Sequence, residues 1–221
     1  MRIFSHNLLA TFYFNFKMLP WRQAIKFPFI FYGKVKFMRT SGNIKFTSTP
    51  NTGTVRIGAQ GSEMFPTNTT VIDIAGTLEI EGIQVRIGRG TLIRIEDTGH
   101  IKLNNCRIGA KSIIFAEKLI DIGHNTGLSW NCQLMDSDRH CIIDIHSQVI
   151  KEKTKPIIIK DNCWIGNHVI INKGTIIPPN TIIASSSLCN KDYSKTILPY
   201  SILAGIPVKL ISSGKRRLPD T

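Results

Sequence analysis

The chain has 221 residues, of which 42% are apolar, and this is the size of about one domain with a sizeable core. Lys and Arg exceed Asp and Glu by 28 to 15, and the formal net charge of +13 favours an anionic partner such as a phosphorylated cofactor, an acidic glycan or a membrane surface. A nucleic-acid partner is not predicted, because the basic residues are spread along the chain and are not interleaved with aromatic residues, which gather in its first part.

The chain shows none of the patterns expected of a membrane-spanning, secreted or metal-binding protein. Its apolar stretches stay below the roughly 20 residues that cross a bilayer. The opening segment is interrupted by Asn7, Asn15 and Lys17 and lacks a small-residue cleavage site. The five cysteines are odd in number, form no CxxC pair and have no histidines at ligand spacing, which is typical of free thiols without a metal. We expect a cytoplasmic protein with no integral membrane segment, in peripheral contact with the inner membrane surface at most.

Residues 1–43 are predicted to form an N-terminal cap. A helix of one or two turns is expected over 8–19, ended by Pro20, and a second short helix over 21–26 before Pro28. The aromatic stretch 27–37 has the composition of β-strands and would supply the first of them.

From Ile44 onward, aliphatic residues recur at a spacing close to six. The spacing is strict in the stretch 156–188, at Ile159, Ile165, Ile171, Ile177 and Ile183. An α-helix places its apolar residues three and four apart, and an amphipathic strand two apart. A repeat of six fits a short strand followed by a tight corner, which is the pattern of a parallel β-helix whose coils bury their inner faces by stacking. We therefore predict an all-β domain over 44–221, with a C-terminal tail over 189–221.

The repeat is interrupted at 135–155 by a polar, charged segment, which we expect to be a loop extruded from one coil. Loops held by a rigid scaffold often carry function. Within this loop, His140 is the candidate general base, and His146 is its competitor.

A nearby carboxylate would orient His140, with Asp138 as first choice and Asp136 and Asp144 as alternatives. Residues two apart in an extended strand lie roughly 6.5 Å apart, so the loop has to curl for a direct hydrogen bond. Cys141 adjoins His140, but neighbours in an extended chain face opposite ways, so no covalent intermediate on Cys141 is expected.

Three motifs resemble those of the hexapeptide-repeat acyltransferases, which include the maltose, galactoside and serine acetyltransferases and the O-acetyltransferases of cell-surface polysaccharides. Trp164-Ile165-Gly166 matches the family pattern fully, and Lys191-Asp192 matches with Asn190 in place of Thr. The closing turn 204–209 matches except for Val208. The resemblance is strong over 135–212, and Arg139 stands where the family commonly has Gly.

The resemblance implies a left-handed β-helix of triangular section and a homotrimer with acetyl-coenzyme A (acetyl-CoA) between neighbouring prisms. It also implies which residues contact that cosubstrate: Gly166, Asn167, Ser185, Asn190, Lys191 and Lys209, with Trp164 either lining the groove or packing on its own coil. The backbone at Gly166 and Asn167 is the expected place for an oxyanion donor. Trp130, Asn131 and Asp136 flank the loop and are candidates for binding a sugar.

These observations predict an acetyl-CoA-dependent O-acetyltransferase acting on a sugar hydroxyl in the biosynthesis of a surface polysaccharide, such as capsule, O-antigen or exopolysaccharide. Its partners would be coenzyme A and a carbohydrate acceptor. Two alternatives stay open. The acceptor could be the amine of an amino sugar or amino acid, or the chain could be a non-catalytic scaffold that binds an anionic glycan or a membrane.

Overall fold

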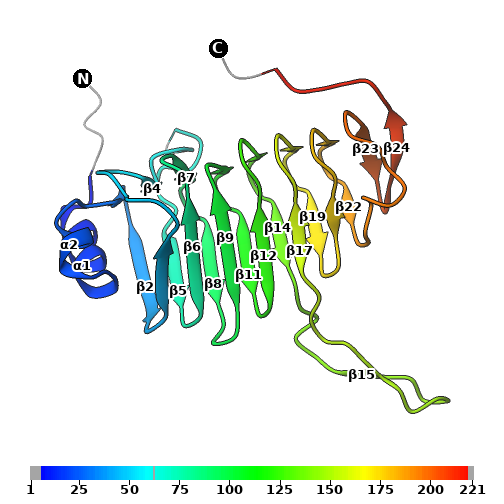
Figure 1. Ribbon diagram of the computed structural model, residues 1–221, viewed down its shortest axis with the longest axis horizontal. Helices are drawn as coiled ribbons and strands as arrows, with labels where there is room; N and C mark the ends of the chain where they lie inside the picture. Colours follow the sequence, from blue (N-terminus) through cyan, green and yellow to red (C-terminus); the bar gives the residue numbers. More distant parts are fainter. Residues whose placement is uncertain (1–5, 62, 219–221) are drawn as a thin grey trace.

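The computed structural model describes residues 6–61 and 63–218, which form an elongated prism with three sheet faces (Figure 1). The first face contains β1 (Phe29–Phe31), β4 (Val55–Ile57), β7 (Val85–Ile87), β10 (Arg107–Ile108), β13 (Gly127–Leu128), β18 (Trp164–Ile165), β21 (Ile182–Ile183), β23 (Ile202–Gly205) and β24 (Val208–Ser212). The second face contains β2 (Val35–Thr40), β5 (Thr70–Ile74), β8 (Leu92–Ile95), β11 (Ile113–Ala116), β14 (Gln133–Met135), β19 (Ile170–Asn172) and β22 (Leu188–Cys189). The third face contains β3 (Asn43–Phe46), β6 (Thr77–Glu81), β9 (His100–Asn104), β12 (Leu119–Ile122), β17 (Ile157–Ile159) and β20 (Ile176–Ile177).

The chain visits the three faces in turn, so each circuit is one coil of a parallel β-helix. Neighbouring strands on all three faces pair in parallel, except that β23 and β24 are antiparallel. The all-β class and the β-helix that the spacing of six predicts are therefore what the chain forms.

The predicted isoleucine ladder forms the inside of the prism. Ile159 pairs with Ile122 and Ile177 in the neighbouring coils, and Ile171 pairs in the same way with Leu134 and Cys189. All five ladder residues are at most 1% exposed. Burial of each such side chain contributes about 1.5–3 kcal/mol, so the stacked interior is the main source of stability.

The helices α1 (Leu8–Met18) and α2 (Trp21–Ala24) cover one end of the prism, close to where the sequence places two helices. The coils nevertheless begin earlier than the predicted boundary at residue 44, because β1 and β2 already pair with β4 and β5. The reason is chemical. The inward residues of the first coil include Phe29 and Phe31, so the aliphatic spacing does not reveal it.

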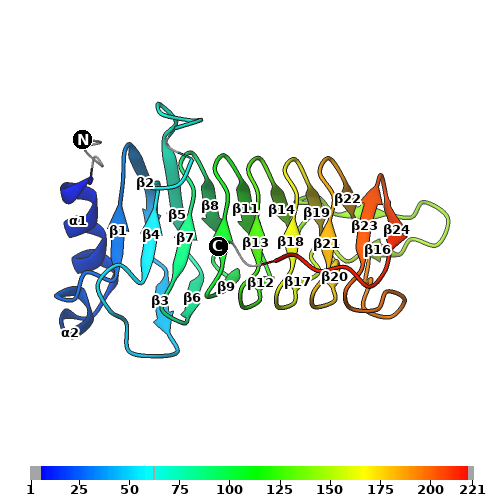
Figure 2. The same ribbon diagram turned by 90° about the horizontal axis from the view of Figure 1, so that it is seen from above.

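The loop 135–155 is extruded as predicted, and it leaves the prism between β14 and β17 (Figure 1). Its outer part is a hairpin of β15 (Ile142–Ile143) and β16 (Ile150–Lys151). After β24, the chain turns back over the first face (Figure 2). Neither helix within residues 6–61 and 63–218 has the length and hydropathy needed to cross a membrane.

Candidate active site

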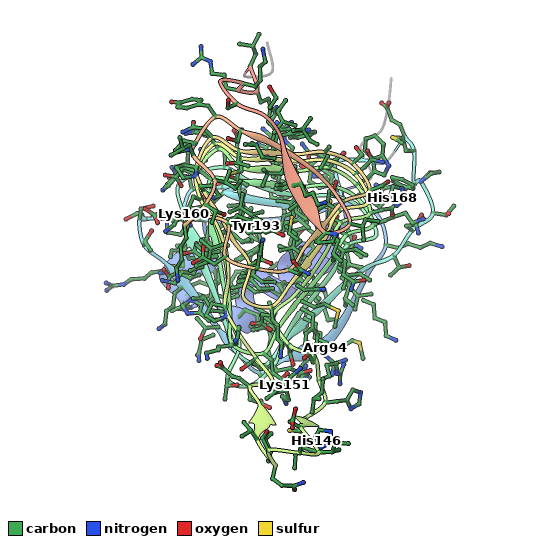
Figure 3. The ribbon with its side chains drawn as sticks, turned by 90° about the vertical axis from the view of Figure 1, so that its right-hand side faces the viewer. Arg94, His146, Lys151, Lys160, His168 and Tyr193 are labelled. Atoms are coloured by element: carbon green, nitrogen blue, oxygen red, sulfur yellow. The ribbon has the colours of Figure 1, made fainter. Side chains whose placement is uncertain are left out.

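Seen along its long axis, the prism is triangular, and its three edges carry different residues (Figure 3). The loop with His146 and Lys151 leaves the loop edge, between the second and third faces. His168 lies at the Trp130 edge, between the first and second faces, and Lys160 lies at the third edge. The predicted site residues lie on the loop edge, on the Trp130 edge and on the first face.

Asp136 anchors the base of the loop to the coil before it. Its side chain is fully buried, and its carboxylate accepts hydrogen bonds from the backbone N–H groups of Glu117, Lys118 and Leu119 at 2.8, 2.8 and 2.7 Å. Burial raises the pKa of Asp136, and the three N–H donors oppose that rise. A carboxylate enclosed in this way does not fit the predicted contact with substrate. Asp136 supports the loop instead.

Two ion pairs fix the rest of the loop stem. Glu117 accepts hydrogen bonds from the Ser137 hydroxyl and the Lys153 ammonium. Burial alone would raise the pKa of Glu117, but these hydrogen bonds outweigh it, and the pKa is lowered. Asp138 pairs with Lys173 of the following coil at 2.7 Å.

Glu117, Lys153 and Lys173 were not among the residues predicted from the sequence. Glu117 and Lys153 are 36 residues apart in the sequence. These pairs could have been found only from the number of residues in each coil, because this number determines which corners of successive coils lie next to each other on the loop edge.

His140 lies exposed on the loop and makes no hydrogen bond to another residue in the described part of the chain. Of the three candidate orienters, Asp136 is enclosed, Asp138 pairs with Lys173, and Asp144 accepts hydrogen bonds from the backbone of His146 and Ser147 at 3.0 and 2.8 Å. In the described part of the chain, none of the three carboxylates forms a hydrogen bond or ion pair with His140. The imidazole is therefore exposed to solvent and accessible to a group from outside the chain.

The residue before His140 turns the chain by adopting a left-handed conformation. Arg139 has φ +61°, a region that favours glycine, and its guanidinium lies 5.0 Å from the centre of the Phe115 ring. The contact with Phe115 accounts for an arginine at a position where the hexapeptide-repeat acyltransferases commonly have Gly.

Cys141, next to His140, is the exposed one among the five free cysteines. Burial raises the pKa of the Cys132 thiol to about 11 and the pKa values of Cys106, Cys163 and Cys189 to about 12. These four thiols belong to the core.

A second group of predicted residues meets at the Trp130 edge. The Ser185 hydroxyl donates to the Asn167 side-chain oxygen at 2.6 Å, and the Asn131 amide lies 3.4 Å from His168. Trp130 is 36% exposed. The structure thus brings Trp130, Asn131, Asn167 and Ser185 together along one edge.

Gly166 permits the close stacking of this edge, because a Cβ there would lie 2.6 Å from the backbone nitrogen of Ser185. Its own N–H donates to the Ile183 carbonyl at 2.8 Å, so it is not available for an oxyanion. The N–H of Asn167 has no acceptor within residues 6–61 and 63–218, and it is the better oxyanion donor of the two.

The remaining predicted residues lie elsewhere. Trp164 lies on the first face, where Cζ of Arg217 is 4.3 Å from the centre of its ring. Asn190 and Lys191 follow β22 at the loop edge, and the Lys191 ammonium lies 5.6 Å from the centre of the Tyr193 ring. Lys209 is exposed on β24. Within one chain, Trp164 and Lys209 therefore do not lie around His140.

A cavity of about 430 Å³ opens on the first face, beside the third edge. Its lining includes Arg86, Arg107 and Asn125, and Arg217 and Leu218 contribute to it from the C-terminal tail. None of the predicted site residues lines this cavity. Within the described residues, His, Cys, Asp and Glu form no group that could hold a metal ion.

Comparison with known proteins places the chain among acetyltransferases, although no family model matches it. An uncharacterized 24.8 kDa protein in the cps region of Klebsiella pneumoniae is 31% identical over 197 residues, which are 89% of this chain and 84% of that protein. Galactoside O-acetyltransferase of Escherichia coli (strain K12) is 43% identical over 56 residues, so this match spans 25% of the chain and 26% of the enzyme.

Among solved structures, the polysialic acid O-acetyltransferase OatWY matches with a TM-score of 0.50 and 20% identity, over 85% of this chain and 92% of that chain. This likeness concerns the fold, and it agrees with the left-handed β-helix that the resemblance implies. Together with the sequence motifs, these relatives show that the chain belongs to the hexapeptide-repeat acyltransferase family.

Proposed function

We propose that this acyltransferase transfers an acetyl group from acetyl-CoA to a sugar hydroxyl of a surface polysaccharide or its precursor. The observation that carries the proposal is His140, an unpaired imidazole on a loop that Asp136, Glu117 and Lys173 fix to an otherwise regular prism. The name of the relative from the cps region and the O-acetyltransferase activity in the name of the E. coli relative support a carbohydrate hydroxyl as acceptor.

In the proposed reaction, His140 acts as the general base and a backbone N–H as the oxyanion donor. A ring nitrogen of His140 takes the proton of the acceptor hydroxyl, and the oxygen attacks the thioester carbonyl carbon. A backbone N–H such as that of Asn167 holds the oxygen of the tetrahedral intermediate. The intermediate then collapses, the carbon–sulfur bond breaks, and the imidazolium returns its proton to the sulfur of coenzyme A.

This mechanism requires a second copy of the chain. His140 lies on the loop edge, while Asn167 and Ser185 lie on the Trp130 edge, at the other side of the second face. The loop also exposes five aliphatic side chains that the described residues leave uncovered, namely Ile142, Ile143, Ile145, Val149 and Ile150, at 46–75% exposure. An apolar hairpin of this kind favours burial against a partner.

We therefore infer a homotrimer of prisms lying side by side, in which the loop of one copy reaches the Trp130 edge of the next. Acetyl-CoA would lie in the groove between them, with Asn167 and Ser185 along its arm. Lys191, Lys209 and Asn190 would lie toward its phosphates, which require cations, and Trp164 would flank the groove. Trp130 and Asn131 would contact the sugar. The free cysteines favour a reducing, cytoplasmic location.

The test is thiol release from acetyl-CoA by the full chain, with a panel of neutral glycans, acidic glycans and amino sugars. We expect release to depend on a glycan, and His140→Ala to lower turnover by at least about 100-fold. His146→Ala, on the same loop, is the matched control and should stay near the wild-type rate. If His146→Ala is inactive and His140→Ala is not, the base is misassigned.

The same assay separates the alternatives. An amide product that resists mild alkaline hydrolysis would establish an amine acceptor. A folded chain that shows no heat of binding with coenzyme A would favour the non-catalytic scaffold.

A further inference from the structure

Helix α1 turns two apolar and two polar side chains inward, namely Ala10, Phe14, Thr11 and Asn15. The buried side chains of Thr11 and Asn15 bond to the free backbone edge of β1. The Asn15 side chain donates to the Phe29 carbonyl at 2.8 Å and accepts from the Phe29 N–H at 3.1 Å, while the Thr11 hydroxyl accepts from the Phe31 N–H at 3.0 Å. The helix thus closes the edge of the first face, which would otherwise pair with other strands.

The outward side of the cap is apolar. We call this surface the cap face; it consists of the exposed apolar residues of the two helices and the residue after them, namely Leu8, Leu9, Phe12, Tyr13, Trp21 and Ile25, at 46–86% exposure. Ring contacts of Phe16 with Phe12 and Trp21, at 4.5 and 5.3 Å between centroids, make the surface continuous. Folding alone does not account for this arrangement, because a cap that faces water normally places polar groups outward.

The charge around the cap face has a single sign. Residues 1–62 contain nine Lys and Arg and no Asp or Glu, the first acidic residue being Glu63. Lys17, Arg22 and Lys26 are exposed among the apolar residues and form no ion pair with another described residue. Exposed Leu, Phe and Trp beside Lys and Arg are the composition of helices that lie in the interface of a membrane.

We propose that the cap face docks on the surface of a bilayer that contains anionic lipids. The apolar side chains enter the boundary between headgroups and acyl chains, and the three basic side chains contact lipid phosphates. A second copy of the chain fits less well, because two caps face to face would bring together positive charges with no acidic partners.

The shape of the molecule suits this contact. Helix α1 lies across the end of the prism, so a flat surface perpendicular to the long axis meets α1 and α2 together (Figure 2). The loop with His140 points toward the opposite end (Figure 1). Docking therefore leaves the loop free, and the inference stands independently of the acyl transfer proposed above.

The experiment is flotation of the full chain with vesicles of phosphatidylcholine, alone or mixed with phosphatidylglycerol. We expect binding to the mixed vesicles only. The double variant Leu9→Gln/Phe12→Gln should weaken it by at least about tenfold, because two apolar side chains no longer leave water. Replacing Lys17, Arg22 and Lys26 by Gln should weaken it by about fivefold for each charge, most strongly at low salt.

Leu198→Gln/Ile206→Gln is the matched control, since these side chains are 78% and 75% exposed at the other end of the prism. Thermal unfolding verifies that every variant is folded. Equal binding by Leu9→Gln/Phe12→Gln and wild type, or no binding to phosphatidylglycerol vesicles, would overturn the proposal. The proposal would also be overturned if sedimentation showed an assembly of several chains that Leu9→Gln/Phe12→Gln dissociates. In that case, a second copy of the chain would cover the cap face.

Discussion

The role of Asp136 as the anchor of the loop leads to a quantitative prediction for Asp136→Asn. The substitution keeps the shape of the side chain but turns one acceptor oxygen into an NH₂ group, which faces N–H donors of the turn 117–119. A hydrogen bond to a charged acceptor contributes about 1.5–3 kcal/mol, and a buried donor without a partner costs about 1–3 kcal/mol. We expect the free energy of unfolding to fall by about 2.5–6 kcal/mol, the sum of the two effects, which lowers the thermal midpoint by roughly 5–24 °C in a chain of this size.

The assay is urea unfolding followed by circular dichroism, with Asp138→Asn as the matched control. Asp138 is 37% exposed, and its surface ion pair with Lys173 contributes about 0–1 kcal/mol, so this variant should unfold close to wild type. The reasoning is refuted if Asp136→Asn unfolds at the wild-type urea concentration. If it then also lacks turnover, Asp136 contacts the substrate after all.

Glu117, the exposed Cys141 and the buried Ile171 each allow a separate test. The pKa of Glu117 is lowered in the folded state, so its ionised carboxylate stabilises the fold at pH values above 4.5, the ordinary pKa of a glutamate. This stabilisation is lost as the pH falls through the folded-state pKa. Glu117→Gln should therefore lower the thermal midpoint at neutral pH, and its difference from wild type should shrink in acid. Of the five cysteines, Cys141 alone should react rapidly with a thiol reagent in the native chain, and the other four only after denaturation; rapid labelling of a second thiol would contradict the buried assignment. Ile171→Ala, inside the ladder, should cost about 2–5 kcal/mol of unfolding free energy, whereas its outward neighbour Ile170→Ala should cost far less, and equal losses would show that the inward register is wrong.

The sequence alone predicts the regular part of the fold, because a spacing of six admits few structures. Each ladder residue must return to the interior once per strand and corner, and Ile159 to Ile183 do so. The interruption of the spacing also identifies the loop, since the positions six and twelve residues after Leu134 are His140 and His146 and not aliphatic residues.

The irregular parts could not be predicted, for specific reasons. The first coil uses phenylalanine in place of the aliphatic residue, so its start at Phe29 is invisible to the repeat. The interval of eight from Ile87 to Ile95 suggests an insertion at a corner. In the structure, β8 simply turns both Ile93 and Ile95 inward, and Ile93 keeps the spacing of six.

The candidate site shows a deeper limit of sequence reasoning. Asp136, Asp138 and His140 are near neighbours in the sequence, which suggests a shared role. The structure separates their roles. Asp136 is buried and accepts hydrogen bonds from the preceding coil, whereas Asp138 forms an ion pair with Lys173 of the following coil. Contacts between coils depend on the length of each coil, and no short motif encodes it.

The central claim is that His140 of one chain works with the Trp130 edge of another, and mixing two inactive variants tests it most directly. His140→Ala removes the base, and Ser185→Trp fills the groove where the arm of acetyl-CoA is expected, without altering the loop. Trimers reassembled from equal amounts of the two should regain about a quarter of wild-type thiol release, because half of the loops and half of the edges they meet are intact. If mixed trimers form and stay as inactive as either variant alone, the two groups do not act across an interface, and the account of the site is wrong.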